Sequence, residues 1–168
     1  MYLDFAKAFD KVPHRRLISK LATHGKTGNI LRWIGNWLSD RRQRVSVDGE
    51  LSEWASVKSG VPQGSVLGPL LFLVYINDID EDLVSKLNKF ADDSKVAKVV
   101  NDTADVEKLR GDLVKFQNWS RDWQMEFNSD KCTVMHIGKK NLNSQYALNG
   151  INLKPTEIKR DLIGSISG

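Results

Sequence analysis

The stretch Leu87–Val100, with the sequence LNKFADDSKVAKVV, decides the fold that we expect for this chain. Apolar residues that favour strands are interleaved with polar ones on both sides of Ala91-Asp92-Asp93. Interleaving of this kind is typical of a strand with one buried face, and Asp is a favoured turn residue. The stretch therefore predicts a β-hairpin whose turn carries two adjacent carboxylates.

Another carboxylate, Asp4, ends the strand-like run Met1-Tyr2-Leu3, at the point where a buried sheet would meet solvent. Hard divalent cations such as Mg²⁺ prefer carboxylate oxygens. Two such ions about 4 Å apart activate an attacking 3′-hydroxyl and stabilise a leaving pyrophosphate. Asp4 and Asp92 on adjacent strands would suit such a pair of ions. The alternative is that Asp92 and Asp93 belong to an ordinary solvated turn.

Outside this hairpin the sequence predicts an α+β fold on a mostly antiparallel sheet. Helices are indicated by apolar residues at helical spacing, and hairpins by Asp-Gly and Asn-Gly pairs. The expected elements are a helix between Pro13 and Gly25, a helix over Ile30–Leu38, a hairpin at Asp48-Gly49, an apolar helix over Val66–Asn77, an amphipathic helix with Val106, Leu109, Leu113, Phe116 and Trp123 on one stripe, a strand over Lys131–Ile137, a hairpin at Asn149-Gly150 and a strand-like run over Leu162–Gly168. Trp33, Trp37, Trp119 and Trp123 also fall at helical spacing and are interpreted as core residues.

Composition excludes several classes of protein. The 168 residues are 40% hydrophobic and 27% charged, as in a globular domain, and the net charge of +4 suits a phosphate-bearing partner. Cys132 is the only cysteine, so there is no disulfide framework or cysteine-based zinc site. The longest apolar run, Val66–Ile76, is shorter than the roughly 20 residues that cross a bilayer. No signal segment opens the chain. We expect an intracellular protein, nuclear or cytoplasmic, without a membrane segment.

Four blocks of the sequence carry a resemblance to a known family. Residues 2–10 read YLDFAKAFD, residues 60–72 read GVPQGSVLGPLLF and residues 90–93 read FADD. Residues 119–138 contain Asn128, Lys131, Cys132 and Met135. In this order the blocks resemble motifs A, B, C and D of the reverse transcriptases of non-LTR (LINE-type, jockey-like) retrotransposons. The resemblance implies a polymerase palm, with the chain cut at both ends and with fingers and thumb absent.

The resemblance also implies a metal site. Asp4 and Asp92 would bridge two Mg²⁺ ions, with Mn²⁺ as a substitute, and Asp93 would be a supporting third carboxylate. The backbone carbonyl of Phe5 would complete the metal shell. Lys131 would protonate the leaving pyrophosphate, although a solvated surface lysine explains it nearly as well.

Other residues would bind the incoming nucleotide. Phe9 would exclude a 2′-hydroxyl, or alternatively would be a core aromatic between helix and sheet. Gln63 and Gly64 would contact the nucleotide and template, with Gly60 also allowing close approach. The alternative is an ordinary loop that caps a helix.

The function implied by the resemblance is RNA-directed DNA polymerisation. The partners would be an RNA template, a DNA primer and deoxyribonucleoside triphosphates. We expect the 168-residue chain to be inactive alone, because the parts that grip the triphosphate and clamp the duplex are not encoded in it. The alternative function is that of an inactive retroelement relic or a co-opted fragment that binds nucleic acid or protein.

Overall fold

The computed structural model of this chain describes residues 1–161 and 164–167. The chain divides into two compact units, and each is described here by itself. The sheet unit combines Met1–Ala6 with Asp78–Gly168, and the helical unit is Lys7–Asn77. The strand-like run expected over Leu162–Gly168 is described only at Gly164–Ser167, because Leu162, Ile163 and Gly168 lie outside the described residues.

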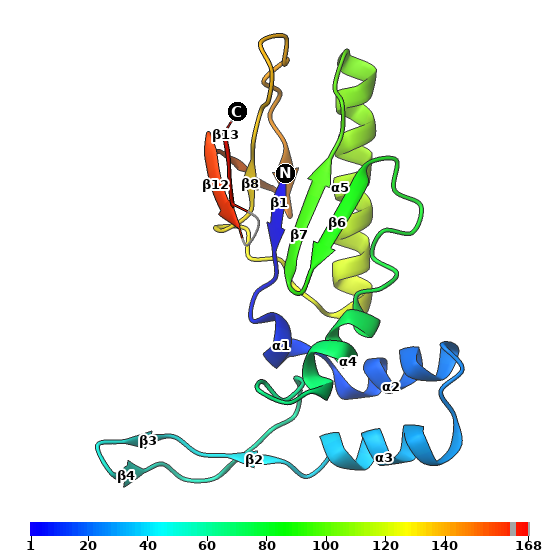
Figure 1. Cartoon of the computed structure of the whole chain (residues 1–168), viewed down its shortest axis with the longest axis vertical. Helices are drawn as coiled ribbons and strands as arrows, with labels where there is room; N and C mark the ends of the chain where they lie inside the picture. Colours follow the sequence, from blue (N-terminus) through cyan, green and yellow to red (C-terminus); the bar gives the residue numbers. More distant parts are fainter. Residues whose placement is uncertain (162–163, 168) are drawn as a thin grey trace. The chain divides into compact units, whose positions relative to one another are not determined.

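The described part of the sheet unit contains a five-stranded sheet in the order β11-β8-β1-β7-β6 (Figure 1). Every neighbouring pair is antiparallel except β11 and β8, which are parallel. The strands are β1 (Tyr2–Asp4), β6 (Lys86–Phe90), β7 (Asp93–Ala97), β8 (Thr133–Val134) and β11 (Lys154–Pro155). This arrangement confirms the predicted α+β class. The pairing of β6 with β7 confirms the hairpin predicted over Leu87–Val100.

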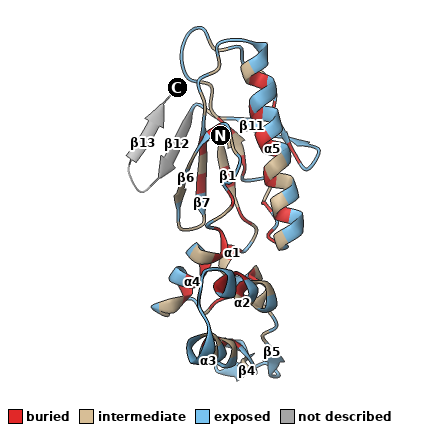
Figure 2. Ribbon diagram, turned by 90° about the vertical axis from the view of Figure 1, so that its right-hand side faces the viewer, coloured by how far each residue is buried: buried red, intermediate tan, exposed pale blue. Residues whose placement is uncertain are grey.

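Helix α5 (Thr103–Trp123) lies alongside this sheet (Figures 1 and 2). The helix begins after Asp102, whose side chain accepts a hydrogen bond from the backbone N–H of Asp105 at 2.9 Å. Its expected apolar stripe is buried at Val106, Leu109, Leu113 and Phe116. Figure 2 shows buried positions spaced along this helix. Burial of this stripe joins helix and sheet into one core.

Short hairpins complete the sheet unit. Strands β9 (Ala147–Leu148) and β10 (Ile151–Asn152) pair around Asn149-Gly150, both of which have positive φ. This confirms the turn predicted there. Strands β12 (Ile158–Asp161) and β13 (Gly164–Ser167) form a further antiparallel pair.

The helical unit is built from α1 (Ala8–Lys11), α2 (His14–Thr23), α3 (Gly28–Leu38) and α4 (Leu67–Tyr75). Its core includes Leu17, Leu21, Leu38, Phe72 and Tyr75. Lys20 is also buried, and its Nζ donates a hydrogen bond to the carbonyl oxygen of Tyr75. This bond compensates for taking the amino group out of water.

An arm of two short strand pairs extends between α3 and α4. Strands β2 (Arg42–Gln43) and β5 (Ala55–Ser56) pair at its base, and β3 (Ser46–Val47) and β4 (Glu50–Leu51) pair at its tip. The predicted turn at Asp48-Gly49 is present, with positive φ at both residues. Every residue of these four strands is exposed.

The prediction that the tryptophans are core residues is wrong for Trp33. Its side chain is 54% exposed and stacks on Trp37, with ring centroids 6.2 Å apart. Helix α3 is instead anchored in its unit by Ile34 and Leu38. Trp37, Trp119 and Trp123 are half-buried. In the described part of the chain, no helix is long and apolar enough to cross a membrane.

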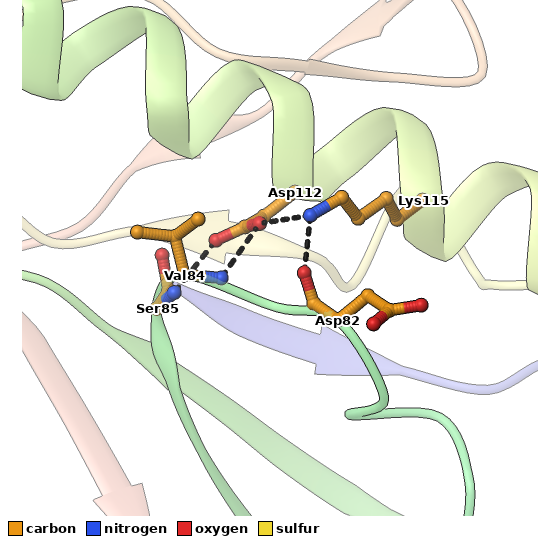
Figure 3. A network of polar contacts seen from close by, with 5 residues as sticks. All are labelled: Asp82, Val84, Ser85, Asp112 and Lys115. Atoms are coloured by element: carbon orange, nitrogen blue, oxygen red, sulfur yellow. Dashed lines mark hydrogen bonds and ion pairs between the residues drawn. The ribbon is translucent and has the colours of Figure 1, made fainter.

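A buried carboxylate ties α5 to the loop before β6 (Figure 3). Asp112 accepts hydrogen bonds from the backbone N–H groups of Val84 at 3.1 Å and Ser85 at 2.8 Å. Lys115 lies 3.4 Å from the same carboxylate and also donates to the carbonyl oxygen of Asp82. Burial raises the pKa of Asp112, but these hydrogen bonds outweigh it, so the pKa lies below its ordinary value.

We predict that Asp112→Ala lowers the free energy of unfolding by about 2–4 kcal/mol, because two backbone amides lose their acceptor. Chemical denaturation at neutral pH measures this loss. Because the pKa of Asp112 is lower in the folded protein than in the unfolded chain, where it is about 3.9, its ionised carboxylate stabilises the fold at pH values above that of the unfolded chain. This stabilisation is lost as the pH falls through the pKa that Asp112 has in the folded protein. The difference between wild type and variant should therefore shrink in acid.

Asp122→Ala is the matched control for this prediction. Asp122 is on the same helix, but its side chain is 68% exposed and its contact is a 3.6 Å ion pair with Arg121. Its loss should change the free energy of unfolding by no more than about 0.5 kcal/mol. Equal effects of the two substitutions would refute the structural role of Asp112.

Candidate active site

The register of the sheet brings two of the predicted site residues opposite each other. Strand β1 lies between β7 and β8, and Asp4 is the direct cross-strand partner of Asp93. Side chains of directly opposed residues in an antiparallel pair extend from the same face of the sheet. The intervening residues Leu3 and Ser94 are buried. The two carboxylates therefore share the face opposite that buried layer.

Asp92 lies beside this pair in the turn of the β6–β7 hairpin. Phe90 pairs with Asp93, so Ala91 and Asp92 form a two-residue turn. Ala91 has a φ of 52°, in the left-handed region that costs a non-glycine residue about 1–2 kcal/mol. Strained backbone of this kind is often found at functional sites. Asp92 is half-buried and Asp93 is exposed.

A turn over residues 128–132 holds the backbone of Asp4. The N–H of Asn128 donates to the carbonyl oxygen of Asp4 at 2.8 Å, and the N–H of Asp4 donates to Cys132 Sγ at 3.4 Å. The turn is closed by hydrogen bonds from the N–H groups of Lys131 and Cys132 to the carbonyl oxygen of Asn128, at 3.0 and 3.1 Å. Both backbone groups of Asp4 are therefore fixed by one segment.

Lys131 projects from this turn toward the carboxylate of Asp4. Its Nζ lies 3.9 Å from Asp4 Oδ1, and the two side chains are 64% and 30% exposed. An ion pair so open to solvent contributes little to stability. It does show that a cationic group reaches the carboxylate oxygens of Asp4.

The donor set suits a hard divalent cation. The described residues contain no group of three or more His, Cys, Asp or Glu side chains arranged to hold a metal. Mg²⁺, however, is usually bound by one or two carboxylates together with substrate phosphates, rather than by a cage made only of protein. The opposed carboxylates of Asp4 and Asp93, with Asp92 next in the chain, offer oxygen ligands of the required kind.

Phe5 is fixed mainly by its ring. It is buried, forms an isolated antiparallel bridge with Phe127 and stacks on that ring at 4.7 Å between centroids. The following residue, Ala6, donates its N–H to the carbonyl oxygen of Glu126 at 2.8 Å. These contacts fix the position of the two residues that follow Asp4. Metal binding by the backbone carbonyl of Phe5 stays a prediction.

The predicted nucleotide-binding residues belong to the helical unit. Phe9 is half-buried and packs on the fully buried Phe72, with ring centroids 4.7 Å apart. Gln63 Nε2 lies 3.4 Å from Asp10 Oδ1, a long hydrogen bond between exposed side chains. Gly64 has a φ of 77° and open space where a Cβ would be.

Gly60 approaches the backbone of residues 9–10 closely. A Cβ at Gly60 would lie 2.7 Å from the carbonyl oxygen of Asp10 and 2.8 Å from that of Phe9. The neighbouring Val61 N–H donates to the Phe9 carbonyl at 2.7 Å. His14 Nε2 lies 2.8 Å from the carbonyl oxygen of Gly60. Gly60 therefore joins two segments of the unit that are about 50 residues apart in sequence.

Sequence reasoning missed the structural use of Asn128, Cys132 and His14. All three act through the backbone of other site segments rather than through a substrate. Cys132 is fully buried. No signal in the sequence indicates that its sulfur faces Asp4.

Comparison with known proteins identifies the class to which this arrangement belongs. A family described as reverse transcriptase (RNA-dependent DNA polymerase) matches residues 1–159. The chain belongs to this family, which confirms the resemblance seen in its motifs.

Particular relatives narrow the class to polymerases of mobile elements. The RNA-directed DNA polymerase from mobile element jockey of Drosophila melanogaster is 35% identical over 141 residues, which cover 78% of this chain and 15% of that protein. The probable RNA-directed DNA polymerase from transposon X-element of the same species is 34% identical over 139 residues, with 78% and 15% covered. The chain thus spans about a seventh of the length of these relatives.

The two loop glycines give a matched test of the helical unit. Gly64→Ala should cost about 1–2 kcal/mol, because only its positive φ disfavours a side chain. Gly60→Ala carries the same backbone penalty and in addition forces apart two backbone segments, which costs about 1–3 kcal/mol more. Thermal or chemical unfolding of the two variants measures the difference. If Gly64→Ala proves the more damaging, the close approach at Gly60 does not stabilise this unit.

Proposed function

We propose that this chain is part of the palm of an RNA-directed DNA polymerase, which extends a DNA primer on an RNA template. In this proposal Asp4, Asp92 and Asp93 hold two Mg²⁺ ions, which Mn²⁺ can replace. The observation that supports it most is the cross-strand opposition of Asp4 and Asp93 beside Asp92. Two carboxylates held face to face are unfavourable unless a cation or solvent offsets their charge.

The reaction is nucleotidyl transfer. The primer 3′-hydroxyl gives its proton to water, and its oxygen forms a bond to the α-phosphorus of a deoxyribonucleoside triphosphate. The bond from that phosphorus to the oxygen that bridges to the β-phosphate breaks. The electron pair of the broken bond leaves with pyrophosphate. When bound, the divalent ions supply Lewis-acid stabilisation of the attacking and leaving oxygens. The protein contributes mainly by positioning and by charge.

Lys131 is the proposed general acid. Its ammonium group carries the proton that the departing pyrophosphate oxygen needs, and a proton given in the transition state typically speeds such steps by about 10²–10⁴-fold. Its position 3.9 Å from Asp4 Oδ1 supports this role, because the side chain already reaches one of the proposed metal ligands. The neighbouring turn residues fix its backbone.

Phe9, Gln63 and Gly64 are the proposed contacts of the incoming nucleotide and template. The partly exposed ring of Phe9 packs on Phe72, which restricts its movement. A ring held in this way is suited to excluding a 2′-hydroxyl. Gln63 is exposed and makes one long hydrogen bond, so its amide is available to a base or sugar. The open space at Gly64 suits close approach by a nucleic-acid strand.

Primer extension tests the proposed function. In the longer polymerase that contains this chain, Asp92→Asn should abolish Mg²⁺-dependent extension of a DNA primer on an RNA template. The matched control Asp122→Asn, at an exposed site, should leave extension unchanged. The 168-residue chain alone should not extend the primer, because it spans only 15% of the relatives' length. Full activity of the Asp92→Asn polymerase would refute the metal site.

Sugar selection tests the role of Phe9 separately. In the same longer polymerase, Phe9→Ala should raise incorporation of ribonucleotides relative to deoxyribonucleotides, because it removes bulk and leaves the carboxylates intact. Loss of the contact with Phe72 should also lower stability by about 3 kcal/mol, so the ratio is measured at a temperature where the variant is folded. An unchanged ratio would mean that Phe9 is only a core residue.

A further inference from the structure

A cavity of about 520 Å³ lies within the sheet unit, and none of Asp4, Asp92 and Asp93 lines it. It is lined by the start of β1, the segment Lys95–Val100, the segment Val134–Gly138 and residues of α5 and the loop that follows β8. Asp93 begins β7, whereas Lys98 follows its end. At about 3.4 Å per residue, Lys98 lies roughly 17 Å along the strand from Asp93. The cavity also reaches Tyr2 and Lys95, which lie two residues from Asp4 and Asp93 on the same strands, but none of the three carboxylates lines it.

The floor of the cavity is apolar and partly aromatic. Val96, Leu109, Val134 and Tyr146 line it and are all buried in the core. The rings of His136 and Tyr146 lie nearly parallel, with an interplanar angle of 27° and centroids 6.3 Å apart. Flat rings and aliphatic side chains of this kind suit an aromatic base.

The charge of the cavity has one sign. Lys95, Lys98 and Lys140 line it, and among the described residues that line it there is no Asp or Glu. Lys98 also interacts with an acidic group outside the cavity, because its charge helps to lower the pKa of Asp105 after the larger effects of hydrogen bonds from Asn101 and Lys108. Asp105 also pairs with Lys108 at 3.1 Å. The cavity thus favours an anionic group.

The ring of His136, which lines the cavity, is held by a hydrogen bond to Asn141. His136 Nδ1 lies 3.0 Å from Asn141 Oδ1, and the same oxygen accepts a hydrogen bond from the N–H of Asn143 at 3.0 Å. An oxygen that accepts from Asn143 also accepts from the ring, so Nδ1 carries the proton. This contact fixes the orientation of the His136 ring that stacks on Tyr146.

We propose that this cavity binds a nucleotide unit, with its base against His136, which stacks on the buried Tyr146, and its phosphate near the lysines that line the cavity. The volume suits a ligand of this size, since pockets for small ligands usually span about 300–1,000 Å³. Lysine is a common phosphate binder. The site shares no residue with Asp4, Asp92 or Asp93 and stands apart from the proposed polymerase function.

Calorimetric titration of the 168-residue chain with AMP and with adenosine tests this site. EDTA is present throughout, so that binding that depends on a metal does not contribute. AMP should bind at least about tenfold more tightly than adenosine, because only AMP reaches the lysines. An Asp92→Asn chain should bind AMP as the wild type does, so failure of the proposed metal site would leave this result intact.

Lysine variants locate the binding. Replacing Lys95, Lys98 and Lys140 together by Gln should reduce the affinity for AMP to that for adenosine. The charge-matched control, with Lys26, Lys58 and Lys154 replaced by Gln, should keep it. If the first triple variant does not fold, Lys140→Glu alone, at an exposed position, should still weaken AMP binding about tenfold.

Titration with a short RNA distinguishes the two possible ligands, a free nucleotide and the end of a nucleic-acid strand. Tighter binding of 5′-phosphorylated tetra-adenylate than of AMP would identify the end of a strand as the ligand, and equal binding would identify a free nucleotide. Either result supports the site. No binding of AMP or RNA, or binding that survives in the Lys95, Lys98 and Lys140 variant, would overturn the proposal.

Discussion

The sheet unit depends on one unfavourable arrangement, the opposition of Asp4 and Asp93 across β1 and β7. Like charges directly opposite each other destabilise a pair of strands, and the ammonium group of Lys131, 3.9 Å from Asp4 Oδ1, counters this repulsion. A sheet that only needed to be stable would gain by an uncharged residue at either position. The arrangement supports the cation site that we propose, and contacts elsewhere hold it in place.

Those contacts come from three directions. Leu3 and Ser94 are buried behind the carboxylates, so the strands cannot slip by one residue without turning apolar side chains to solvent. The turn over residues 128–132 holds both backbone groups of Asp4. The β6–β7 hairpin keeps Ala91 in a left-handed conformation and places Asp92 beside Asp93. Each contact fixes the backbone that carries a carboxylate, which supports the preorganised site that we propose.

The sequence predicts the local elements well because they depend on local chemistry. The turns at Asp48-Gly49 and Asn149-Gly150 and the stripe of α5 follow from residue types at fixed spacing. The pairing of Asp4 with Asp93 rather than Asp92 is a matter of register between distant segments, which spacing alone does not determine. The exposure of Trp33 is likewise not determined by local chemistry. Helical spacing indicates that α3 is a helix, but it does not indicate which side of the helix packs against the rest of its unit.

The metal site is the central claim, and paramagnetic broadening by Mn²⁺ tests it most directly. In NMR spectra of the 168-residue chain, substoichiometric Mn²⁺ should first broaden the backbone amide signals of Asp4, Asp92 and Asp93. Asn128 and Lys131 should follow, because their turn contacts Asp4. Excess Mg²⁺ should restore all of these signals. Uniform broadening over the chain, or broadening centred on another acidic cluster, would contradict the account.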